Sequence, residues 1–305
     1  MPEYQGVDIR DANFHALDPE GAFVIFCRYA TDQTLDWIER FAEQLAGVGL
    51  FVDDNIPAVI TSPESSIPYK FKLFTKGLWP LRRLNRHLDI VWVSTPRLAQ
   101  ELPEVRPRVL PPAPAFSLWK SPFVDIALSS KPSVHIAFHA TGIHVQEHRF
   151  LQPVIRKILA ERQTVSFEVF ADARTAPLWK GIDRATIRQP LPWLDYLQEG
   201  IHRKIDIMLV PMSRSLVNDC RSATKRIDVA RAGAAGVFSI SEAYGCPGAD
   251  GEIRIPNIRA IWQETILNLI DAPLARLSAA ETTRAIVEQM SHQADDGLDF
   301  NRLSA

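Results

Sequence analysis

Three polar side chains at three-residue spacing, those of Ser222, Lys225 and Asp228, form the most chemically suggestive pattern in the sequence. At about 100° per residue they lie on one face of a helix predicted over residues 222–232. A helix that follows a strand presents unpaired backbone N–H groups and a positive dipole end, and Lys225 adds a full charge one turn further. This combination suits a diphosphate group, and the carboxylate of Asp228 suits the hydroxyls of a ribose.

A purely structural interpretation of this helix stays open. Lys225 and Asp228 at i, i+3 spacing are also typical of a solvated face with a weak salt bridge. Two small apolar residues, Val229 and Ala232, flank the polar face and favour a groove over open water. The opposite face is expected to pack on a sheet through Ala223, Ile227, Ala230 and Ala234.

Further polar groups precede this helix. Asn218 and Asp219 are candidate helix caps, because short side chains with a free oxygen accept hydrogen bonds from the first backbone amides of a helix. Arg221 places a second cation near the expected helix start. A diphosphate bound there would therefore meet two positive side chains.

A second polar loop follows a predicted strand over residues 134–138 and contains His139, Gly142 and His144. His144 is a candidate to hydrogen-bond a phosphate or a sugar, because an imidazole can be protonated near neutral pH. Glu147 either belongs to the same site or stabilises the start of the next helix by charge and capping. His139 is expected to line a buried turn.

The elements that must position these residues alternate along the chain. Strands are expected at residues 22–26, 49–52, 90–93, 108–110, 134–138, 165–170, 185–188, 207–210 and 236–240. Short apolar strands alternating with amphipathic helices predict an α/β fold with parallel sheets covered on both faces. Three prolines within residues 111–114 interrupt the pattern. We therefore expect two Rossmann-like domains facing a cleft, over residues 1–115 and 116–275, with a C-terminal helix in residues 276–305 that packs back on the first domain.

The composition limits the classes of function. The 305 residues are 46% hydrophobic and 23% charged with a formal net charge of -2, which argues against a nucleic-acid partner. Three widely spaced cysteines form neither a disulfide framework nor a zinc ribbon. The sequence has neither the apolar run of a signal peptide nor the roughly 20 apolar residues of a membrane-spanning helix. A cytoplasmic location is expected.

Several cofactor motifs are missing. The sequence has no G-x-G-x-x-G fingerprint, no Walker A lysine loop and no zinc-binding cluster, so we expect no cofactor and no metal. Asp53 and Asp54 form an acidic pair that could hold Mg²⁺. A turn at the end of a strand explains this pair equally well and is the favoured interpretation.

The segment from Asn218 through Ser222, Lys225 and Asp228 to Gly233-Ala-Ala-Gly-Val-Phe-Ser resembles the donor-site segment of family 4-like glycosyltransferases with the GT-B fold. The preceding Asp206-Ile-Met-Leu-Val-Pro matches a D-I-x-L-x-P strand of that family. The resemblance covers roughly residues 90–244. Asp228 stands where the family usually has glutamate, so its ribose contact is a weaker expectation.

The resemblance implies a metal-independent, retaining transfer of a sugar from a nucleoside-diphosphate donor to a glycan or lipid-linked acceptor, with a role in cell-surface polysaccharide synthesis. It gives Lys225 and His144 catalytic roles. The implied donor-binding residues are Gly142, Asn218, Arg221, Ser222, Lys225, Asp228 and Trp193. The resemblance places Trp193 beside the nucleobase, whereas its pattern alone favours a core residue after a proline-rich turn. The alternatives are a GT-B protein that binds sugar nucleotides or glycans without catalysis and a two-lobed small-molecule binding protein.

One basic segment lies outside this pattern. Residues 69–88 carry six lysines and arginines and no acid, interleaved with Phe71, Phe74 and Trp79. A basic amphipathic segment with tryptophan is typical of a helix that lies on anionic lipid. A surface helix with an apolar inner face has the same pattern. The first interpretation adds a peripheral contact with the inner face of a membrane and suits a lipid-linked acceptor.

Overall fold

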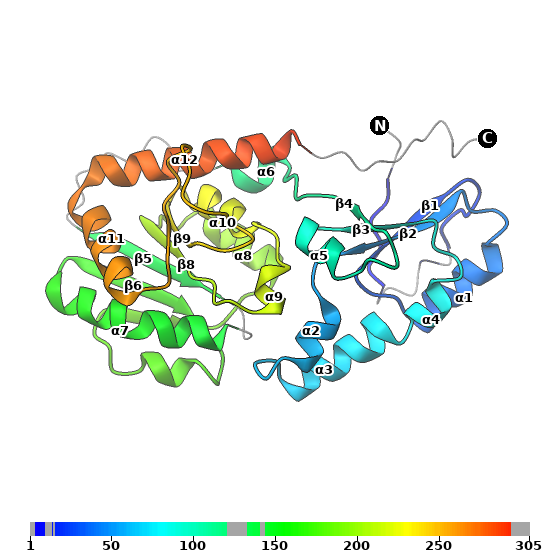
Figure 1. The fold of residues 1–305 in the computed structure, drawn as a ribbon, viewed down its shortest axis with the longest axis horizontal. Coiled ribbons are helices and arrows are strands. Elements are labelled where there is room, and N and C mark those ends of the chain that lie inside the picture. The colour runs from blue at the N-terminus through cyan, green and yellow to red at the C-terminus, as the bar shows by residue number, and fades with distance from the viewer. Residues whose placement is uncertain (1–3, 10–13, 15, 121–132, 141–143, 294–305) are drawn as a thin grey trace. The chain divides into compact units, whose positions relative to one another are not determined.

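The computed structural model describes residues 4–9, 14, 16–120, 133–140 and 144–293 (Figure 1). These residues divide into two compact units, and the division falls between Pro111 and Pro112. The division lies in the proline run that breaks the alternating pattern of the sequence. Each unit has its own parallel sheet, as the sequence predicts.

The first unit is built on a four-stranded sheet in the order β1-β2-β3-β4. Its strands are β1 (Phe23–Cys27), β2 (Gly47–Val52), β3 (Ile90–Val93) and β4 (Arg108–Val109). Trp92 of β3 packs across Gly49 of β2, where a Cβ atom would lie 2.4 Å from the indole ring. A glycine at this place therefore lets the large ring cover the sheet.

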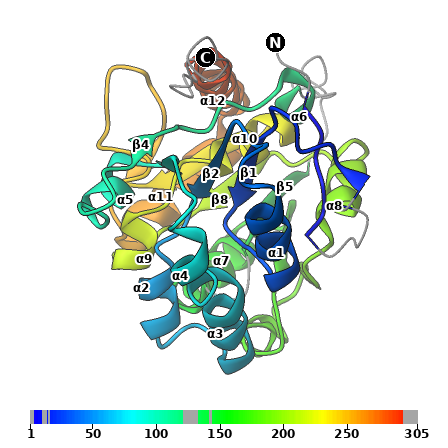
Figure 2. The same ribbon diagram turned by 90° about the vertical axis from the view of Figure 1, so that its right-hand side faces the viewer.

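The helices of the first unit are α1 (Asp32–Phe41), α2 (Ile56–Thr61), α3 (Ile67–Leu73), the π-helical turn η2 (Phe74–Leu78), α4 (Leu81–Leu84) and α5 (Pro96–Gln100). Figure 2 views the chain from the side of this unit. Thr31 forms a capping box at the start of α1, which fixes where the helix begins. Leu35 and Ile38, one turn apart on α1, are buried with Val48 and Leu50 of β2.

An ion-paired turn follows the first strands. The Nε atom of Arg28 donates to Asp53 Oδ1 at 2.6 Å, and its Nη2 lies 3.1 Å from Asp54 Oδ2. One arginine thus holds both acids, which supports the strand-end interpretation of this pair. Within the described ranges, no group of three or more His, Cys, Asp or Glu residues is arranged to hold a metal ion.

The second unit is built on a six-stranded parallel sheet in the order β10-β9-β8-β5-β6-β7. Its strands are β5 (Val134–His139), β6 (Val165–Phe170), β7 (Ala185–Arg188), β8 (Ile207–Val210), β9 (Ala235–Ser239) and β10 (Arg254–Ile255). Strands β6 and β7 lie on one side of β5, and strands β8, β9 and β10 lie on the other. The strand order therefore reverses between β5 and β8.

Helices cover both faces of this sheet (Figure 1). They are α6 (Phe116–Trp119), α7 (Val145–Glu161), the 3-10 helix η4 (Ala176–Trp179), α8 (Trp193–Gly200), α9 (Leu216–Asp219), α10 (Lys225–Ala232), α11 (Arg259–Asp271) and α12 (Pro273–Ser291). Leu151 of α7 and Trp262 of α11 are buried in the larger core on one face. Val229 of α10 is buried with Met208 and Val210 of β8 on the other face.

The packing of α10 corrects one expectation. Ile227 and Ala230, predicted to face the sheet, instead pack with Trp119 of α6 and Val287 of α12. Val229, predicted to flank the polar face, lies against the sheet. The periodicity of a short helix that is covered on two sides does not tell which apolar stripe meets the sheet, because both stripes are buried.

Helix α12 packs against α10 and β9 of the second unit. The described part of the C-terminal segment therefore belongs with the second unit and does not form a separate element that starts at residue 276. No helix among the described residues is long and apolar enough to cross a bilayer.

Candidate functional site

The reversal of strand order between β5 and β8 marks the place where a ligand site is expected. In open α/β sheets, the loops at the carboxyl ends of the two strands beside such a reversal diverge and leave room for a ligand. Here β5 ends at His139 and α7 begins at Val145, with residues 141–143 outside the described residues, and residues 211–215 form the loop after β8. Gly142, a predicted donor-binding residue, lies outside the described residues.

The carboxylate of Glu147 joins the start of α7 to the loop after β8. Glu147 lies in the first turn of α7 and is only 1% exposed. Its Oε1 atom accepts hydrogen bonds from the Ser213 backbone N–H at 2.9 Å, the Ser213 hydroxyl at 2.6 Å and the Asn218 carboxamide at 3.0 Å. We call Glu147, Ser213, Asn218, His144 and Arg221 the Glu147 cluster. Its donors fix the loop after β8 to the start of α7.

His144 connects this carboxylate to a cation. Its Nε2 lies 2.9 Å from Nη1 of Arg221, and its Nδ1 lies 3.6 Å from Glu147 Oε2. A guanidinium only donates, so Nε2 accepts, and the ring proton of a neutral imidazole is on Nδ1, facing Glu147. Burial, with the charge of Arg221 added, lowers the pKa of His144. A ring that accepts from Arg221 carries no charge of its own.

Glu147 itself remains ionised. Burial alone would raise the pKa of Glu147, but the interactions with His144 and Ser213 outweigh it and lower the pKa to about 2. The cluster thus holds a buried negative charge with neutral donors, and the cation Arg221 reaches it only through the His144 ring.

Asn218 does not cap the helix that carries Lys225. It lies within the short helix α9, whose cap is Ser215, and its carboxamide also donates to the Ser213 carbonyl at 2.9 Å. Ser222 lies before α10, which begins at Lys225. The predicted helix over residues 222–232 is therefore three residues too long at its start, and the three-residue pattern is not one helix face.

Lys225 and Asp228 do interact. The Lys225 ammonium lies 2.7 Å from Asp228 Oδ2, and the Arg231 guanidinium donates to Asp228 Oδ1 at 2.6 Å. Burial alone would raise the pKa of Asp228, but the two cations lower it. The Lys225 side chain is 37% exposed, whereas Asp228 is buried. The salt bridge of the structural interpretation is thus present, and it orients a lysine that still reaches solvent.

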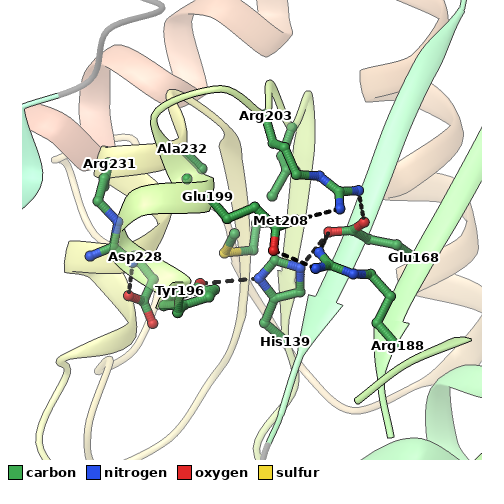
Figure 3. Close-up of a pocket in the computed structure, with 12 residues that line it drawn as sticks. His139, Glu168, Arg188, Tyr196, Glu199, Arg203, Met208, Asp228, Arg231 and Ala232 are labelled. Carbon is green, nitrogen blue, oxygen red and sulfur yellow. Dashed lines mark hydrogen bonds and ion pairs between the residues drawn. The ribbon is translucent and has the colours of Figure 1, made fainter. Parts of the chain in front are cut away.

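A small cavity lies beside Asp228, between β5, α8 and α10 (Figure 3). Its wall includes His139, Glu168, Tyr196 and Arg231. The cavity holds about 30 Å³, which is room for one or two water molecules. A nucleobase does not fit into this space as it stands.

The cavity wall contains a second ionic network, here called the Glu168 cluster: Glu168, His139, Arg188, Glu199 and Arg203. Glu168 accepts a 2.7 Å hydrogen bond from His139 Nε2 and a short one from Arg203. Arg188 lies 3.7 Å from Glu168, and Glu199 bridges Arg188 and Arg203 at 2.5 and 2.6 Å (Figure 3). His139 stacks on Phe170, with ring centroids 4.2 Å apart. His139 is buried, but it is the last residue of strand β5 and does not lie in the expected turn.

Trp193 corrects a further expectation. Its favoured interpretation was a core residue, but at the start of α8 its side chain is 53% exposed. The Arg231 guanidinium lies 5.4 Å from the Trp193 ring and 5.0 Å from the Tyr196 ring. An exposed indole backed by a cation beside Asp228 is suited to receive a planar ligand.

The structure brings Asn218, Arg221 and His144 together, and separately Lys225 with Asp228. Sequence reasoning missed Glu168, although an acid inside the apolar strand Val-Ser-Phe-Glu-Val-Phe is a signal for a buried, paired charge. It also missed Arg231, which lies three residues beyond Asp228 and repeats the spacing that made Lys225 notable.

Known proteins resemble the chain in structure. The chain matches no family profile and no curated protein. TarM aligns with 95% of this chain and 55% of its own, with a TM-score of 0.60 and 8% identity. HepE from Anabaena, solved with UDP and glucose, aligns with 89% of this chain and 76% of its own, with a TM-score of 0.57 and 11% identity. Sucrose-phosphate synthase from Thermosynechococcus elongatus aligns with 92% of this chain and 73% of its own, with a TM-score of 0.56 and 12% identity.

These likenesses show the fold. The chain is an α/β protein with two Rossmann-like domains of the type found in GT-B glycosyltransferases, which confirms the predicted fold class. The chain spans little more than half the length of TarM. A TarM variant from S. aureus has been solved with fondaparinux, alpha-GlcNAc-glycerol and UDP. It aligns with 86% of this chain, with a TM-score of 0.56 and 8% identity.

Proposed function

We propose that the chain is a glycosyltransferase whose second unit binds a nucleoside-diphosphate sugar beside the Glu147 cluster and the start of α10. The observation that carries the proposal is the position of that cluster. Glu147, in the first turn of the helix that follows β5, holds the loop after β8 beside the reversal between β5 and β8, where ligands of open α/β sheets bind. Structural neighbours solved with UDP support the same ligand class.

The cations beside this place suit a departing diphosphate. In the proposed transfer, the bond between the anomeric carbon and the diphosphate oxygen breaks, and the acceptor hydroxyl oxygen forms the new bond to that carbon and loses its proton to the departing diphosphate. Negative charge accumulates on the diphosphate. Lys225, Arg221 and the first backbone amides of α10 would stabilise it. Lys225 therefore has the catalytic role, and no step in this scheme needs a metal or a cofactor.

His144 acts through Arg221 in this scheme. A neutral ring whose Nε2 accepts from Arg221 cannot add charge to the site, but it can hold the guanidinium in one orientation. Asn218, in α9, and Ser222, between α9 and α10, contribute through the connection from β8 to α10. Asn218 fixes this loop through Glu147 and Ser213, and Ser222 remains a candidate donor contact just before α10.

Asp228 and Trp193 would bind the nucleoside. The two oxygens of Asp228 each accept one bond, from Lys225 and Arg231, so further lone pairs remain for ribose hydroxyls. The exposed indole of Trp193 offers a surface on which a base can stack. The finer proposals are a family 4-like mechanism with retention, a glycan or lipid-linked acceptor, and a role in cell-surface polysaccharide synthesis.

Nucleotide binding by the Lys225→Ala variant tests the donor site. Isothermal titration with UDP and GDP should show binding by the parent chain and a loss of at least about tenfold in the variant, the equivalent of one charge-assisted contact. Lys204→Ala is the matched control, because the Lys204 ammonium also lies near an aspartate, 3.6 Å from Asp206, but precedes β8 and so lies at the end of that strand opposite to its carboxyl-end loop. Equal affinity of the two variants would refute the assignment of Lys225.

A second candidate is a GT-B protein that binds sugar nucleotides or glycans without transfer. It is favoured by Asp228, whose carboxylate at the position of the family glutamate is already held by two cations. The two candidates differ in turnover. Release of UDP or GDP from a panel of nucleotide sugars, with and without acceptors, would identify a transferase, whereas binding without release would identify the second candidate.

A further inference from the structure

The helical rod of the first unit presents an outward stripe of large apolar side chains. Ile67, Phe71, Phe74 and Trp79 are 81%, 68%, 46% and 59% exposed. They lie on α3 and on the continuation through η2 toward α4 (Figure 1). A single exposed apolar residue is ordinary, but four on one short rod call for a physical account.

A π-helical turn completes this stripe. Ile67, Phe71 and Phe74 follow one another at i+4 and i+3, which are neighbours on an α-helix. Trp79 is five residues beyond Phe74, and on a regular α-helix the two would point about 140° apart. In η2 the Trp79 N–H donates to the Phe74 carbonyl at 2.8 Å, and the two rings lie side by side with centroids 6.2 Å apart. The extra residue of the turn therefore moves Trp79 into line with the phenylalanines.

The opposite side of the rod is packed. Leu73 and Leu84 are 2% and 1% exposed, and a Cβ atom on Gly77 would lie 3.0 Å from the Ile56 side chain. The rod thus has an inner face that is satisfied within the first unit. The exposed stripe is therefore a second apolar face of the rod, in addition to the face that packs in the core of the first unit.

Positive charge surrounds the stripe. The chain has a net charge of -2, yet residues 65–88 contain no acid and six basic residues: Lys70, Lys72, Lys76, Arg82, Arg83 and Arg86. Of these, Arg83 is held by Asp36 and Glu39. No described carboxylate lies within ion-pair distance of the other five. A second copy of the same face would bring like charges together, which opposes self-association.

We propose that this stripe inserts into the interfacial layer of a membrane that contains anionic lipid, with the five remaining cations at the headgroups. Tryptophan and phenylalanine on one side and lysine and arginine beside them are the composition of helices that lie in that layer. Each cation near an anionic surface contributes about 1 kcal/mol, or about fivefold in affinity. The proposal does not depend on the donor site.

Co-sedimentation of the full chain with vesicles tests the proposal. We expect binding to phosphatidylcholine vesicles that contain phosphatidylglycerol, weak binding to phosphatidylcholine alone, and loss of binding at high salt. Lys72→Glu with Arg82→Glu should weaken binding at least about tenfold. Lys157→Glu with Lys180→Glu, the same charge change at two exposed positions of the second unit, is the matched control. Equal binding to both vesicles, or equal effects of the two double variants, would overturn the proposal.

Insertion of the stripe has its own readout. Lipids brominated on their acyl chains should quench the fluorescence of the parent chain, and Trp79→Phe should remove most of that quenching. Trp193→Phe, a change at a tryptophan of similar exposure in the second unit, should leave the quenching intact. Circular dichroism establishes that both variants are folded. Quenching unaffected by Trp79→Phe, or a dimer in lipid-free solution that Trp79→Ser dissolves, would overturn the proposal. Lys225→Ala should bind vesicles like the parent, which separates this test from that of the donor site.

Discussion

Glu147 and Glu168 are equally buried carboxylates of the second unit, each 1% exposed, but their surroundings differ. Glu168 is enclosed by His139, Arg203 and Arg188, and the second acid Glu199 completes the network. Glu147 accepts from neutral donors, and its nearest cation is separated from it by a histidine ring. The first arrangement balances its own charges around a cavity the size of a water molecule or two. The second fixes the loop after β8 to the start of α7, beside the reversal of strand order.

This difference separates stability from binding. A buried acid that is matched by cations is costly to disturb, because removing one partner leaves charges without compensation. An acid that holds loops through neutral hydrogen bonds affects mainly the positions of what those loops carry, here Arg221 and the start of α10. We therefore expect the Glu168 cluster to control folding and the Glu147 cluster to control ligand affinity.

The largest expected effect is a loss of stability in Glu168→Gln. Arg203 and Arg188 would lose their buried counter-charge, and the free energy of unfolding should fall by about 3 kcal/mol. Urea unfolding followed by circular dichroism measures the change. Glu264→Gln, at an exposed position of α11, should change it by less than about 0.5 kcal/mol. A Glu168→Gln variant as stable as this control would remove the structural role of the cluster.

Acid should destabilise the second unit in two steps. Burial lowers the pKa of His148 to about 4 from an ordinary 6.5. The unfolded state therefore binds this proton first as the pH falls, and the stability is present above pH 6.5 and lost between about 6.5 and 4. The pKa of Glu147, lowered to about 2 from 4.5, adds a second loss that begins below about pH 4.5.

The first step amounts to at most about 3 kcal/mol for His148, from the 2.5-unit difference in pKa. Urea midpoints at pH 7.5 and 5.5 measure the part of this loss that is reached by pH 5.5, about 1.4 kcal/mol. His148→Gln keeps a hydrogen-bond acceptor for the Trp179 indole, which lies 2.8 Å from His148 Nδ1, and should flatten the dependence in this range. His202→Gln, at an exposed position, is the control. If stability still depended on pH in His148→Gln, the dependence would be assigned to His139 and His144, whose pKa values are also lowered by burial.

The positions of most strands along the chain could be predicted from the sequence, because apolar runs and their spacing are local properties. The predicted strands at residues 90–93, 165–170, 185–188 and 207–210 coincide with β3, β6, β7 and β8. The sequence did not predict α9 and β10. They span four and two residues, and no periodicity can be read from so few. Because α9 was missed, the helix after it was extended back to Ser222, and Asn218 was taken for a cap.

The site was predictable only in part. Lys225 and Asp228 share one helix, so their spacing revealed their contact. The contacts of Glu147 with Ser213 and Asn218 bridge 66 and 71 positions, and only the pairing of β5 with β8 brings them together. The neutral state of His144 follows from burial, which depends on tertiary packing. Trp193 was misjudged because an aromatic residue at a helix start is equally compatible with core and surface.

A smaller loss of stability is expected in Glu147→Gln. The amide keeps one oxygen for Ser213 and Asn218, so unfolding should become easier by about 1 kcal/mol, less than in Glu168→Gln. UDP affinity should change in the opposite order: about tenfold weaker in Glu147→Gln and within about twofold of the parent in Glu168→Gln at a temperature where both are folded. Isothermal titration and urea unfolding together give the four values. The same rank order in both measurements would contradict the separation of stability from binding.

The smallest expected effect is that of Trp193→Ala. The ring is 53% exposed and its contact with Arg231 is a cation–π pair, so stability should fall by about 0.5 to 1 kcal/mol. If the indole receives the base, UDP should bind up to about tenfold more weakly, while inorganic diphosphate should bind as it does to the parent. Leu194→Ala, at the next and more exposed position, controls for lost apolar surface on α8. Equal losses for UDP and diphosphate in Trp193→Ala would mean that the residue acts on the phosphate site through Arg231 and Asp228. Asp228 would then have to be grouped with the residues that control phosphate binding.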